Sequence, residues 1–351
     1  MHVLSFDKFT KGSFRIAFLG DIMCREDALS TVANDDPFKF IRKILSMTDY
    51  VTGNLETTLS GETTNYPKFS SNDLLADQLS GLVNLVFTAN NHTYDFGERG
   101  VKRTIKVLDE FGIKHIGTND LPKIRRVLDE ELSKHKLSFL NYTTFLNETE
   151  IDPIYKRVNT PTPPANLINL YNEAKVKETI NLAKERSEIV IVGVHQSPRK
   201  SNARELSRES TREQRQFLAA LSKEGADVVI GGHPHHFQGG EILEDGKVII
   251  YSLGNFYTTM NQSAYRNNVG CIMFMNCDSF SNIFYSFLPI CTMKNEKTNH
   301  YYVIPLSPLE SGYYDWVSEK QRNVFLIELE EIRKILRTYA LIEEEVPIQF
   351  L

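Results

Sequence analysis

The sequence predicts an α/β fold in which buried strands alternate with helices. Six short apolar runs each end in Gly, Asn, Asp or His, a pattern typical of a buried strand with a polar loop at its carboxyl end. Between them lie segments in which apolar residues recur every three or four positions, the period of an α-helix. In such sheets functional groups gather at the carboxyl ends of strands, so the polar loops are the candidate sites of chemistry.

The six predicted strands are defined by their apolar residues and by the polar residues that follow them. They cover residues 14–19, 50–52, 85–88, 189–194, 228–230 and 248–253. The residues that follow are, in the same order, Gly20-Asp21, Gly53-Asn54, Ala89-Asn90-Asn91-His92, His195, Gly231-Gly232-His233 and Gly254-Asn255.

Two helices are predicted between the strands, and each precedes a glycine, which suits the C-terminus of a helix. Their apolar faces are Val101, Ile105 and Leu108 before Gly112, and Phe217, Leu218 and Leu221 before Gly225.

The remaining segments complete one predicted domain over residues 1–351. Residues 147–164 are irregular and contain prolines, which predicts an excursion over the surface. Residues 269–290 are strand-like, 294–300 form a polar loop, and 317–340 have the pattern of an amphipathic helix. We therefore expect a motif-bearing core over residues 13–275, followed by C-terminal strands and a helix over 276–351.

The composition is that of an ordinary globular protein. Of the 351 residues 41% are hydrophobic and 24% are charged, which excludes disordered and collagen-like classes. The 40 basic and 45 acidic side chains give a formal charge of -5, so there is no broad positive field for a phosphate backbone. We expect no nucleic-acid partner.

The cysteines and the N-terminus predict a cytoplasmic location. Cys24, Cys271, Cys277 and Cys291 lack C-x-x-C spacing and are few for the length, which argues against a disulfide framework and a thiolate zinc site. The first residues contain no continuous apolar segment, and no stretch approaches the ~18 apolar residues that span a bilayer. The sequence leaves the oligomeric state open.

The densest polar motif is G-G-H-P-H-H, residues 231–236, directly after a predicted strand. His233 and His235 are two positions apart and can point two imidazoles at one metal ion. The alternatives are a solvated, glycine-rich turn and an incidental metal-binding site.

A second motif, N-N-H-T-Y-D, covers residues 90–95. The amide oxygen of Asn91 can bind a hard metal ion. An imidazole such as His92, held by a carboxylate such as Asp95, is oriented and made more basic, as a general acid or base requires. The alternative is a polar turn in which Asp95 caps the next helix.

Three further strand ends carry Asp21, Glu56 and His195. Each has an ordinary structural explanation alone, because acidic residues cap helices and single histidines are often satisfied core groups. Together with the amide and the two imidazoles above, they make a set of six mixed ligands. Such a set is sufficient for two cations about 3.5 to 4 Å apart.

The chain resembles the poly-gamma-glutamate capsule synthesis (CapA) family of calcineurin-like metallophosphoesterases. The motifs that carry the resemblance are G-D-I-M, G-N-L-E-T, N-N-H-x-x-D-x-G, G-V-H, G-A-D-V-V-I-G-G-H-P-H-H-F-Q and Y-S-L-G-N-F, in this order between residues 14 and 257. The resemblance implies a four-layer αββα sandwich of two mixed sheets, with a dinuclear metal site at the strand ends.

The resemblance also implies a role for each polar residue. One metal ion would be held by Asp21 and His235, the other by Asn91, His195 and His233, and Glu56 stands where the wider superfamily has its bridging aspartate. His92 matches the proton-donating histidine of the family, and Asp95 matches its orienting partner.

The chain departs from the superfamily at two motifs. Most members have D-x-H on the first strand, whereas this chain reads Asp21-Ile22-Met23 and lacks one ligand, as the CapA branch does. The fourth motif often continues as H-W-G-x-E, whereas residues 195–200 read H-Q-S-P-R-K. We expect Arg199 and Lys200 to favour an anionic substrate, with a solvated basic loop as the alternative. Asn255 is expected near the site, as a substrate-binding or a turn residue.

The function that the resemblance implies is a metal-dependent hydrolase of phosphoester type in poly-gamma-glutamate, capsule or polysaccharide biosynthesis. It would use one or two divalent ions of manganese, iron or zinc, and its substrate would be an anionic small molecule or polymer. Two alternatives stay open: a non-hydrolytic accessory protein of capsule or polymer assembly, and a metal-assisted peptide epimerase.

Overall fold

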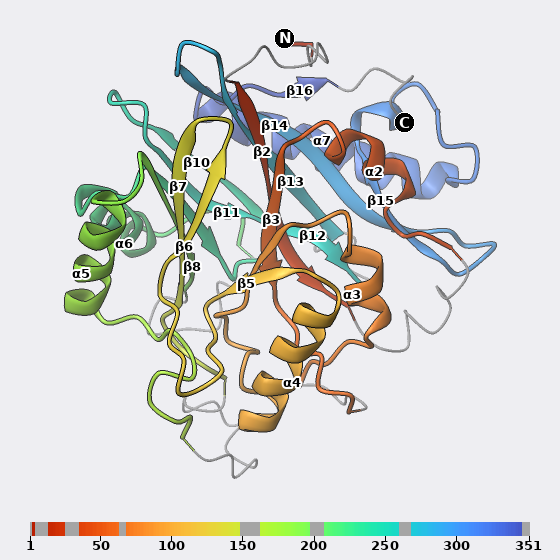
Figure 1. The fold of residues 1–351 in the computed structure, drawn as a ribbon. Helices are drawn as coiled ribbons and strands as arrows, with labels where there is room; N and C mark the ends of the chain where they lie inside the picture. The colour runs from red at the N-terminus through yellow and green to blue at the C-terminus, as the bar shows by residue number, and fades with distance from the viewer. Residues whose placement is uncertain are drawn as a thin grey trace.

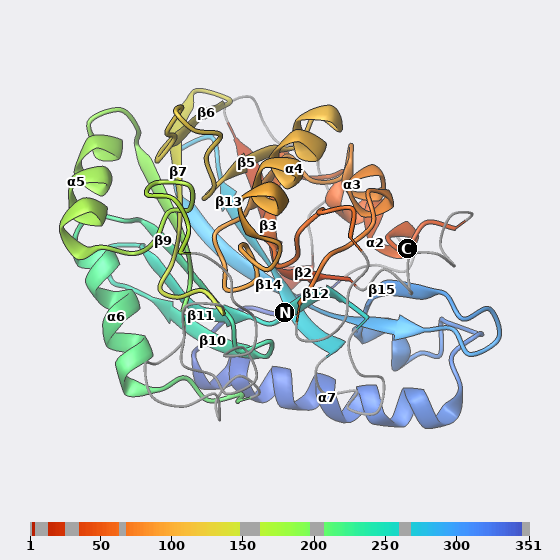
Figure 2. The same ribbon diagram turned by 90° about the horizontal axis from the view of Figure 1, so that it is seen from below.

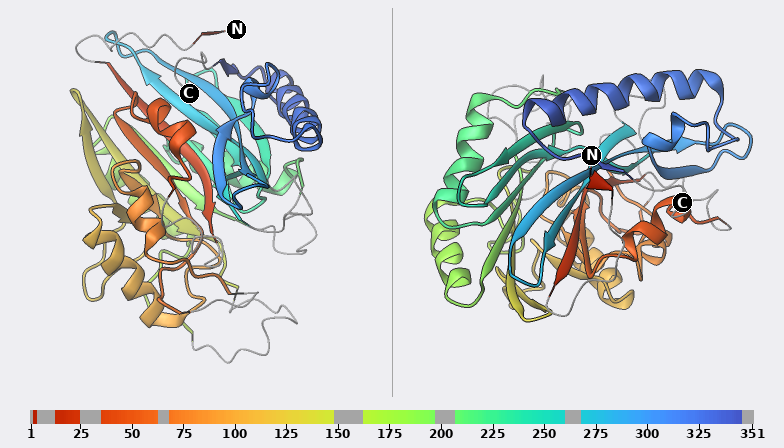
Figure 3. Two further views of the ribbon diagram at one scale, coloured as in Figure 1. Left: turned by 90° about the vertical axis from the view of Figure 1, so that its right-hand side faces the viewer. Right: turned by 90° about the horizontal axis from the view of Figure 1, so that it is seen from above.

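Two β-sheets lie face to face and carry helices on their outer sides (Figures 1 and 3). The computed structural model describes residues 2–3, 13–24, 35–62, 68–147, 162–196, 207–259 and 268–345. Within these ranges the order of layers is helix, sheet, sheet, helix, so the predicted four-layer αββα sandwich of two mixed sheets is confirmed.

Counted over the described residues, the larger sheet has eight strands and mixes parallel with antiparallel pairs. Its order is β15 (Tyr301–Pro305), β14 (Ile283–Lys294), β13 (Val269–Cys277), β2 (Phe14–Met23), β3 (Tyr50–Leu55), β4 (Leu85–Phe87) and β5 (Lys114–Ile116), and β12 (Asn255–Thr258) pairs with β2 outside this path. The strands from β2 to β5 are parallel, whereas β13, β14 and β15 run antiparallel to their neighbours.

In the part of the chain that the structure describes, the second sheet has six strands, parallel in the middle and antiparallel at both edges. Its order is β10 (Phe237–Ile242), β11 (Val248–Leu253), β9 (Val228–Gly232), β8 (Ile189–His195), β7 (His135–Thr143) and β6 (Leu128–Leu132). A further short parallel pair joins β1 (His2–Val3) to β16 (Glu344–Glu345).

The helices cover the outer faces of the two sheets (Figure 3). Those on the larger sheet are α2 (Lys39–Leu45), α3 (Leu74–Leu79) and α4 (Gly97–Glu110), and those on the smaller sheet are α5 (Glu173–Lys184) and α6 (Arg212–Lys223). After the 3-10 turn η4 (Ser307–Leu309), α7 (Glu319–Thr338) packs apolar side chains into the core between the sheets. The amphipathic helix predicted at the C-terminus is therefore confirmed. Among the described residues, no helix combines the length and the apolar character needed to cross a bilayer.

Strand β2 illustrates why the sandwich forms. Phe14, Ile16 and Phe18 face the core between the sheets, and the alternating Ala17 and Leu19 face the helices. Side chains point to opposite faces of a strand at successive positions, so an unbroken apolar run can be buried on both sides. The predicted strand at residues 189–194 packs in the same way on the other sheet.

Strand β2 also continues beyond its predicted end, and this corrects the sequence-based boundary. The prediction ends the strand before Gly20, but β2 extends to Met23, and Asp21 lies within it. The extension forms because β12 pairs with this segment, and the backbone N–H of Asp21 donates to the carbonyl oxygen of Gly254 at 2.9 Å. Asp21 thus lies in a strand, where backbone hydrogen bonds fix its position, rather than in a loop.

Gly20 is expected to tolerate no side chain. A Cβ at Gly20 would lie 1.9 Å from the carbonyl oxygen of Gly254, which the β2–β12 pairing holds in place. We expect Gly20→Ala to lower the free energy of unfolding by about 3 kcal/mol, measured by urea denaturation. Gly246→Ala is the control, because Gly246 has φ +82 with nothing within 4 Å of an added Cβ, so only a backbone cost of about 1 kcal/mol applies. Equal losses in the two variants would contradict the steric explanation.

Candidate metal centre

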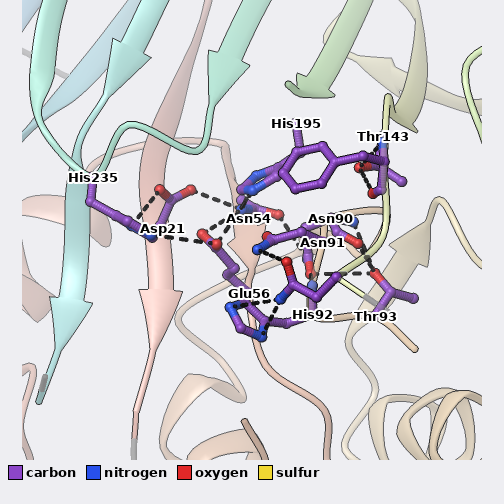
Figure 4. A network of polar contacts seen from close by, with 12 residues as sticks. Asp21, Asn54, Glu56, Asn90, Asn91, His92, Thr93, Thr143, His195 and His235 are labelled. Carbon is purple, nitrogen blue, oxygen red and sulfur yellow. Dashed lines mark hydrogen bonds and ion pairs between the residues drawn. The ribbon is translucent and has the colours of Figure 1, made fainter. Parts of the chain in front are cut away.

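The first part of the site comes from the neighbouring strands β2 and β3. Asp21 of β2 is paired with Asn54 of β3, and Asn54 Nδ2 donates to Asp21 Oδ1 at 2.8 Å (Figure 4). Glu56 follows two residues after Asn54, and its side chain is fully buried. Residues two apart on an extended segment point to the same side, so Asn54 and Glu56 both face Asp21.

The second part is the turn between β9 and β10, which carries His233 and His235. Both residues have positive φ values, 98° and 55°, which L-residues other than glycine adopt rarely and at a cost of about 1–3 kcal/mol each. The turn brings His235 Nδ1 to 3.0 Å from Asn255 Oδ1 and 3.3 Å from Asp21 Oδ2. Backbone strain of this kind is typical of functional sites.

His195 ends strand β8 and completes the set of imidazoles. Its Nε2 lies 3.3 Å from Glu56 Oε1, and its ring centroid lies 5.2 Å from that of His233. The backbone of Gly232 passes close by, and a Cβ there would lie 3.2 Å from His195 Nδ1. A residue without a side chain therefore leaves room for the ring of His195.

Five of these side chains form two groups that share one carboxylate. One group is Glu56, His195 and His233, and the other is Asp21, Glu56 and His235. Within each group the potential ligand atoms lie within 4.8 Å of one another, and every member is buried. The arrangement of two adjacent groups around a shared Glu56 is what a pair of metal ions requires.

The loop after β4 adds Asn91 and His92 beside these groups (Figure 4), and Asp95 follows three residues after His92. Asn91 Nδ2 donates to Asn147 Oδ1 at 2.9 Å, and its buried Oδ1 accepts no hydrogen bond from any residue that the structure describes. His92 Nδ1 lies 2.7 Å from Asp95 Oδ2, and that same oxygen accepts a hydrogen bond from the backbone N–H of Phe69 at 2.7 Å. Asp95 is thus fixed by the backbone and fixes His92 in turn.

Electrostatics set the charge of two members of the site. Burial alone would lower the pKa of His92, but the charge of Asp95, the hydrogen bond to it and the charge of Glu56 raise it above 6.5. Burial alone would raise the pKa of Asp21, but the hydrogen bond and charge of His235, the charge of His195 and the hydrogen bond from Asn54 bring it below 3.8. The Asp21 carboxylate is therefore charged at neutral pH.

Of the site residues proposed from the sequence, all those that the structure describes lie close together. Asn255, expected near the site, contacts His235 and pairs with Asp21 through β12. Met23, two positions after Asp21 in the first motif, is fully buried. Arg199 and Lys200, expected to bind an anionic substrate, lie outside the described residues, as do residues 148–161 of the predicted surface excursion.

Sequence reasoning missed two amides that organise the site. Asn54 Nδ2 lies 2.8 Å from Asp21 Oδ1, 3.4 Å from Glu56 Oε2 and 3.3 Å from His195 Nδ1, so it contacts both groups. The G-N-L-E-T motif contained the signal, because Asn54 and Glu56 are two positions apart. Asn147 Nδ2 lies 3.2 Å from His92 Nδ1, although the two residues are 55 positions apart and no local pattern connects them.

Residues 15–260 match the model of a protein family described as bacterial capsule synthesis protein PGA_cap. The chain belongs to this family. Its similarity to the poly-gamma-glutamate capsule synthesis proteins, expected from the ordered motifs, is thereby confirmed. All the residues of the candidate centre lie within the part that matches the PGA_cap family.

Two curated relatives of this PGA_cap protein are capsule or PGA biosynthesis proteins. The capsule biosynthesis protein CapA of Bacillus anthracis is 26% identical over 253 residues, which are 69% of this chain and 59% of the relative. The PGA biosynthesis protein CapA of Bacillus subtilis is 28% identical over 256 residues, which are 68% of this chain and 62% of the relative. The chain thus spans about three fifths of the length of the curated relatives it matches.

Two solved structures are also similar to this PGA_cap protein. One is a hypothetical protein from Thermus thermophilus, with a TM-score of 0.47 and 14% identity over 83% of this chain and 99% of that one. The other is a putative 5'-nucleotidase from Staphylococcus aureus, with a TM-score of 0.47 and 14% identity over 83% of this chain and 54% of that one.

Proposed function

We propose that this PGA_cap protein is a metal-dependent hydrolase of phosphoesters that acts in the biosynthesis of poly-gamma-glutamate or another capsule polymer. The names of its relatives support the biological setting. The observation that carries the chemistry is the position of Glu56, whose Oε1 lies 3.3 Å from His195 Nε2 and 3.7 Å from His235 Nε2. One carboxylate shared by two groups of potential ligands, each with at least one imidazole, is an arrangement that suits two neighbouring metal ions.

The donor set fits manganese, iron or zinc. Imidazole nitrogens suit iron and zinc, and carboxylate and amide oxygens suit manganese as well. The buried Oδ1 of Asn91 lacks a hydrogen-bond donor among the described residues, and a metal ion would satisfy it. Asp21 and His235 would hold one ion, and Asn91, His195 and His233 the other, with Glu56 between them.

In hydrolysis, the oxygen of a water molecule forms a bond to phosphorus, the bond from phosphorus to the leaving oxygen breaks, and that oxygen takes up a proton. Two divalent ions would supply a water of lowered pKa and would stabilise the charge of the phosphoryl oxygens. His92 supplies the proton, because Asp95 occupies its Nδ1 and leaves Nε2 as the ring atom that can donate. Asn54 holds the Asp21 carboxylate in the orientation that the site needs.

The charge of the ligand set supports an anionic substrate. The proposed ligands include two carboxylates, those of Asp21 and Glu56, and two divalent ions would more than neutralise them. The remaining positive charge lies in a buried site, where it attracts anions more strongly than it would in water. Phosphate esters meet this requirement.

The test is metal content and turnover measured on the same preparations. Protein purified without chelator is analysed for manganese, iron and zinc, and is then assayed with p-nitrophenyl phosphate and bis(p-nitrophenyl) phosphate. One or two ions per chain, with turnover that a chelator abolishes and added metal restores, would support the proposal. Bound metal without turnover of either ester would contradict hydrolysis and favour the accessory role in polymer assembly.

Asn54→Ala is expected to weaken metal binding about 10- to 100-fold, because residues that orient ligands contribute to affinity on this scale. The variant removes the donor to Asp21 and leaves all the proposed ligands in place. Titration of apo-protein with manganese, followed by calorimetry, measures the effect. Asn181→Ala on the exposed side of α5 is the matched control and should bind as the wild type does. An unchanged affinity in Asn54→Ala would remove the orienting role.

A further inference from the structure

A short segment after strand β7, residues 144–147, lies against the candidate metal centre, and we call it the β7 loop. At its start the backbone N–H of Thr144 donates to the carbonyl oxygen of His195 at 3.0 Å. At its end the backbone N–H of Asn147 donates to the carbonyl oxygen of Asn91 at 3.1 Å. Figure 2 shows the molecule from the side on which the parallel strands end, with β7 and β9 of the smaller sheet to the left of β2 and β3 of the larger one. The β7 loop is thus fixed at both ends to residues proposed as metal ligands.

Phe145 of the β7 loop places its ring beside two imidazoles. The ring centroid lies 5.0 Å from that of His233, with 83° between the ring planes, and 6.2 Å from that of His195. Aromatic rings attract one another in edge-to-face pairs whose centroids are about 4.5 to 7 Å apart. Phe145 is held in turn, because Thr143 Oγ1 donates to its carbonyl oxygen at 2.8 Å. The contact therefore holds the ring of His233, whose backbone has the strained φ of 98°.

Asn147 of the β7 loop determines which atom of the Asn91 side chain is available to a metal ion. Asn91 Nδ2 donates to Asn147 Oδ1 at 2.9 Å, so the nitrogen of this amide is engaged. The oxygen of the same amide is buried and accepts no hydrogen bond from any residue that the structure describes. Metal ions bind the oxygen of an amide side chain, because the NH₂ group is a donor only. Asn147 therefore keeps the amide of Asn91 in the orientation that an ion requires.

The contacts of the β7 loop reach every side chain proposed to hold one of the two ions, namely Asn91, His195 and His233. The other ion would be held by Asp21 and His235, and His235 has a support of its own. Its Nδ1 lies 3.0 Å from Oδ1 of Asn255, which belongs to β12. The two ions would therefore depend on different parts of the chain for the orientation of their ligands.

We propose that Phe145 and Asn147 are positioning residues that set the affinity of the centre for the ion held by Asn91, His195 and His233. The inference rests on the proposed function, because it takes these three residues as the ligands of one ion. Phe145 holds the imidazoles and Asn147 holds the amide, so the ion meets ligands that are already in place. Less free energy is then lost in ordering the ligands when the ion binds.

The experiment is calorimetric titration of the metal-free full chain with Mn²⁺ and, separately, with Zn²⁺, in two backgrounds. Asp21→Asn keeps all the ligands of the ion that the β7 loop supports, whereas His233→Ala removes one of them. In the Asp21→Asn background we expect Phe145→Ala to weaken binding about five- to tenfold, the loss of one edge-to-face ring contact. Asn147→Ala should weaken it about 10- to 100-fold, as the loss of a residue that orients a ligand does. In the His233→Ala background neither change should alter the affinity for the remaining ion.

Asn147→Asp tests whether the hydrogen bond to Asn91 is the cause. The new carboxylate still accepts from Asn91 Nδ2, so this variant should restore the affinity that Asn147→Ala loses. It should have no effect in the His233→Ala background, where a higher affinity would show that its charge acts at a distance. Phe280→Ala is the matched control for the aromatic change, because Phe280 is 85% exposed between β13 and β14. It should bind metal as its background does.

Equal losses in the two backgrounds would show a general disturbance of the centre and would overturn the proposal. Unchanged affinity of Phe145→Ala and Asn147→Ala in the Asp21→Asn background would overturn it as well. The titration needs no ester, so the expected losses in a protein that hydrolyses no phosphoester would contradict the proposed function and support the positioning roles. A wild type that binds neither Mn²⁺ nor Zn²⁺ would overturn both.

Discussion

Glu56→Gln is expected to reduce the metal content of the purified protein at both positions, to below about a tenth of the wild-type value. Glu56 belongs to both ligand groups, and its carboxylate is fully buried. The amide that replaces it has nearly the same shape but no charge, and it offers a metal ion one weaker oxygen instead of a shared carboxylate. Elemental analysis of wild type and variant purified in parallel, without chelator, measures the change.

Two further variants distinguish a shared ligand from a general disruption. Asp21→Asn and His233→Ala each alter one group, so each should lose about one of two ions while the other is retained. All three variants should keep the far-ultraviolet circular dichroism of the wild type, because the strands that contain or precede these residues are held by their own backbone pairing. If Glu56→Gln retained both ions, or if Asp21→Asn lost both, Glu56 would not be the shared ligand.

Six strands of the core could be predicted because each carries its own apolar signal, whereas the buried strand β7, whose sequence HKLSFLNYT mixes apolar with polar residues, was not predicted. The run at residues 248–253 is apolar except for Ser252, and it coincides with β11. The edge strand β6 and the short strand β12 gave no such signal, since LDEEL is mostly charged and NFYT has only four residues. Such strands form because a neighbouring strand offers hydrogen bonds, and a partner distant in sequence leaves no local pattern.

The site was predictable to the extent that its residues follow strands. The parallel strands of both sheets place their carboxyl ends at the site, so residues as distant as Asp21 on the larger sheet and His195 on the smaller one could be assigned to one place. The amides that support them could not all be assigned, because Asn147 reaches His92 from a loop of no regular pattern. The positive φ values of His233 and His235 were equally hidden, since the sequence places ordinary L-residues where the backbone is left-handed.

His92→Ala is expected to lower turnover of a phosphoester about 10²- to 10⁴-fold while the metal content stays at the wild-type value. His92 is not a member of either metal-ligand group. Its Nδ1 is hydrogen-bonded to Asp95 and is therefore not available to bind a metal ion. Steady-state kinetics and elemental analysis on the same preparation measure both quantities. Loss of metal in His92→Ala would show that the ring supports the centre itself and would contradict its separate role.

The leaving group provides the sharper test, because a general acid matters most when the leaving oxygen is basic. The loss in His92→Ala should be large with phenyl phosphate and smaller with p-nitrophenyl phosphate, whose phenolate leaves without needing a proton. Asp95→Asn should lower kcat in the same direction but less, with KM little changed, because Asp95 acts only through the orientation and charge of His92. An equal loss with both esters would mean that His92 positions the substrate rather than donating the proton, since only proton donation depends on the basicity of the leaving oxygen.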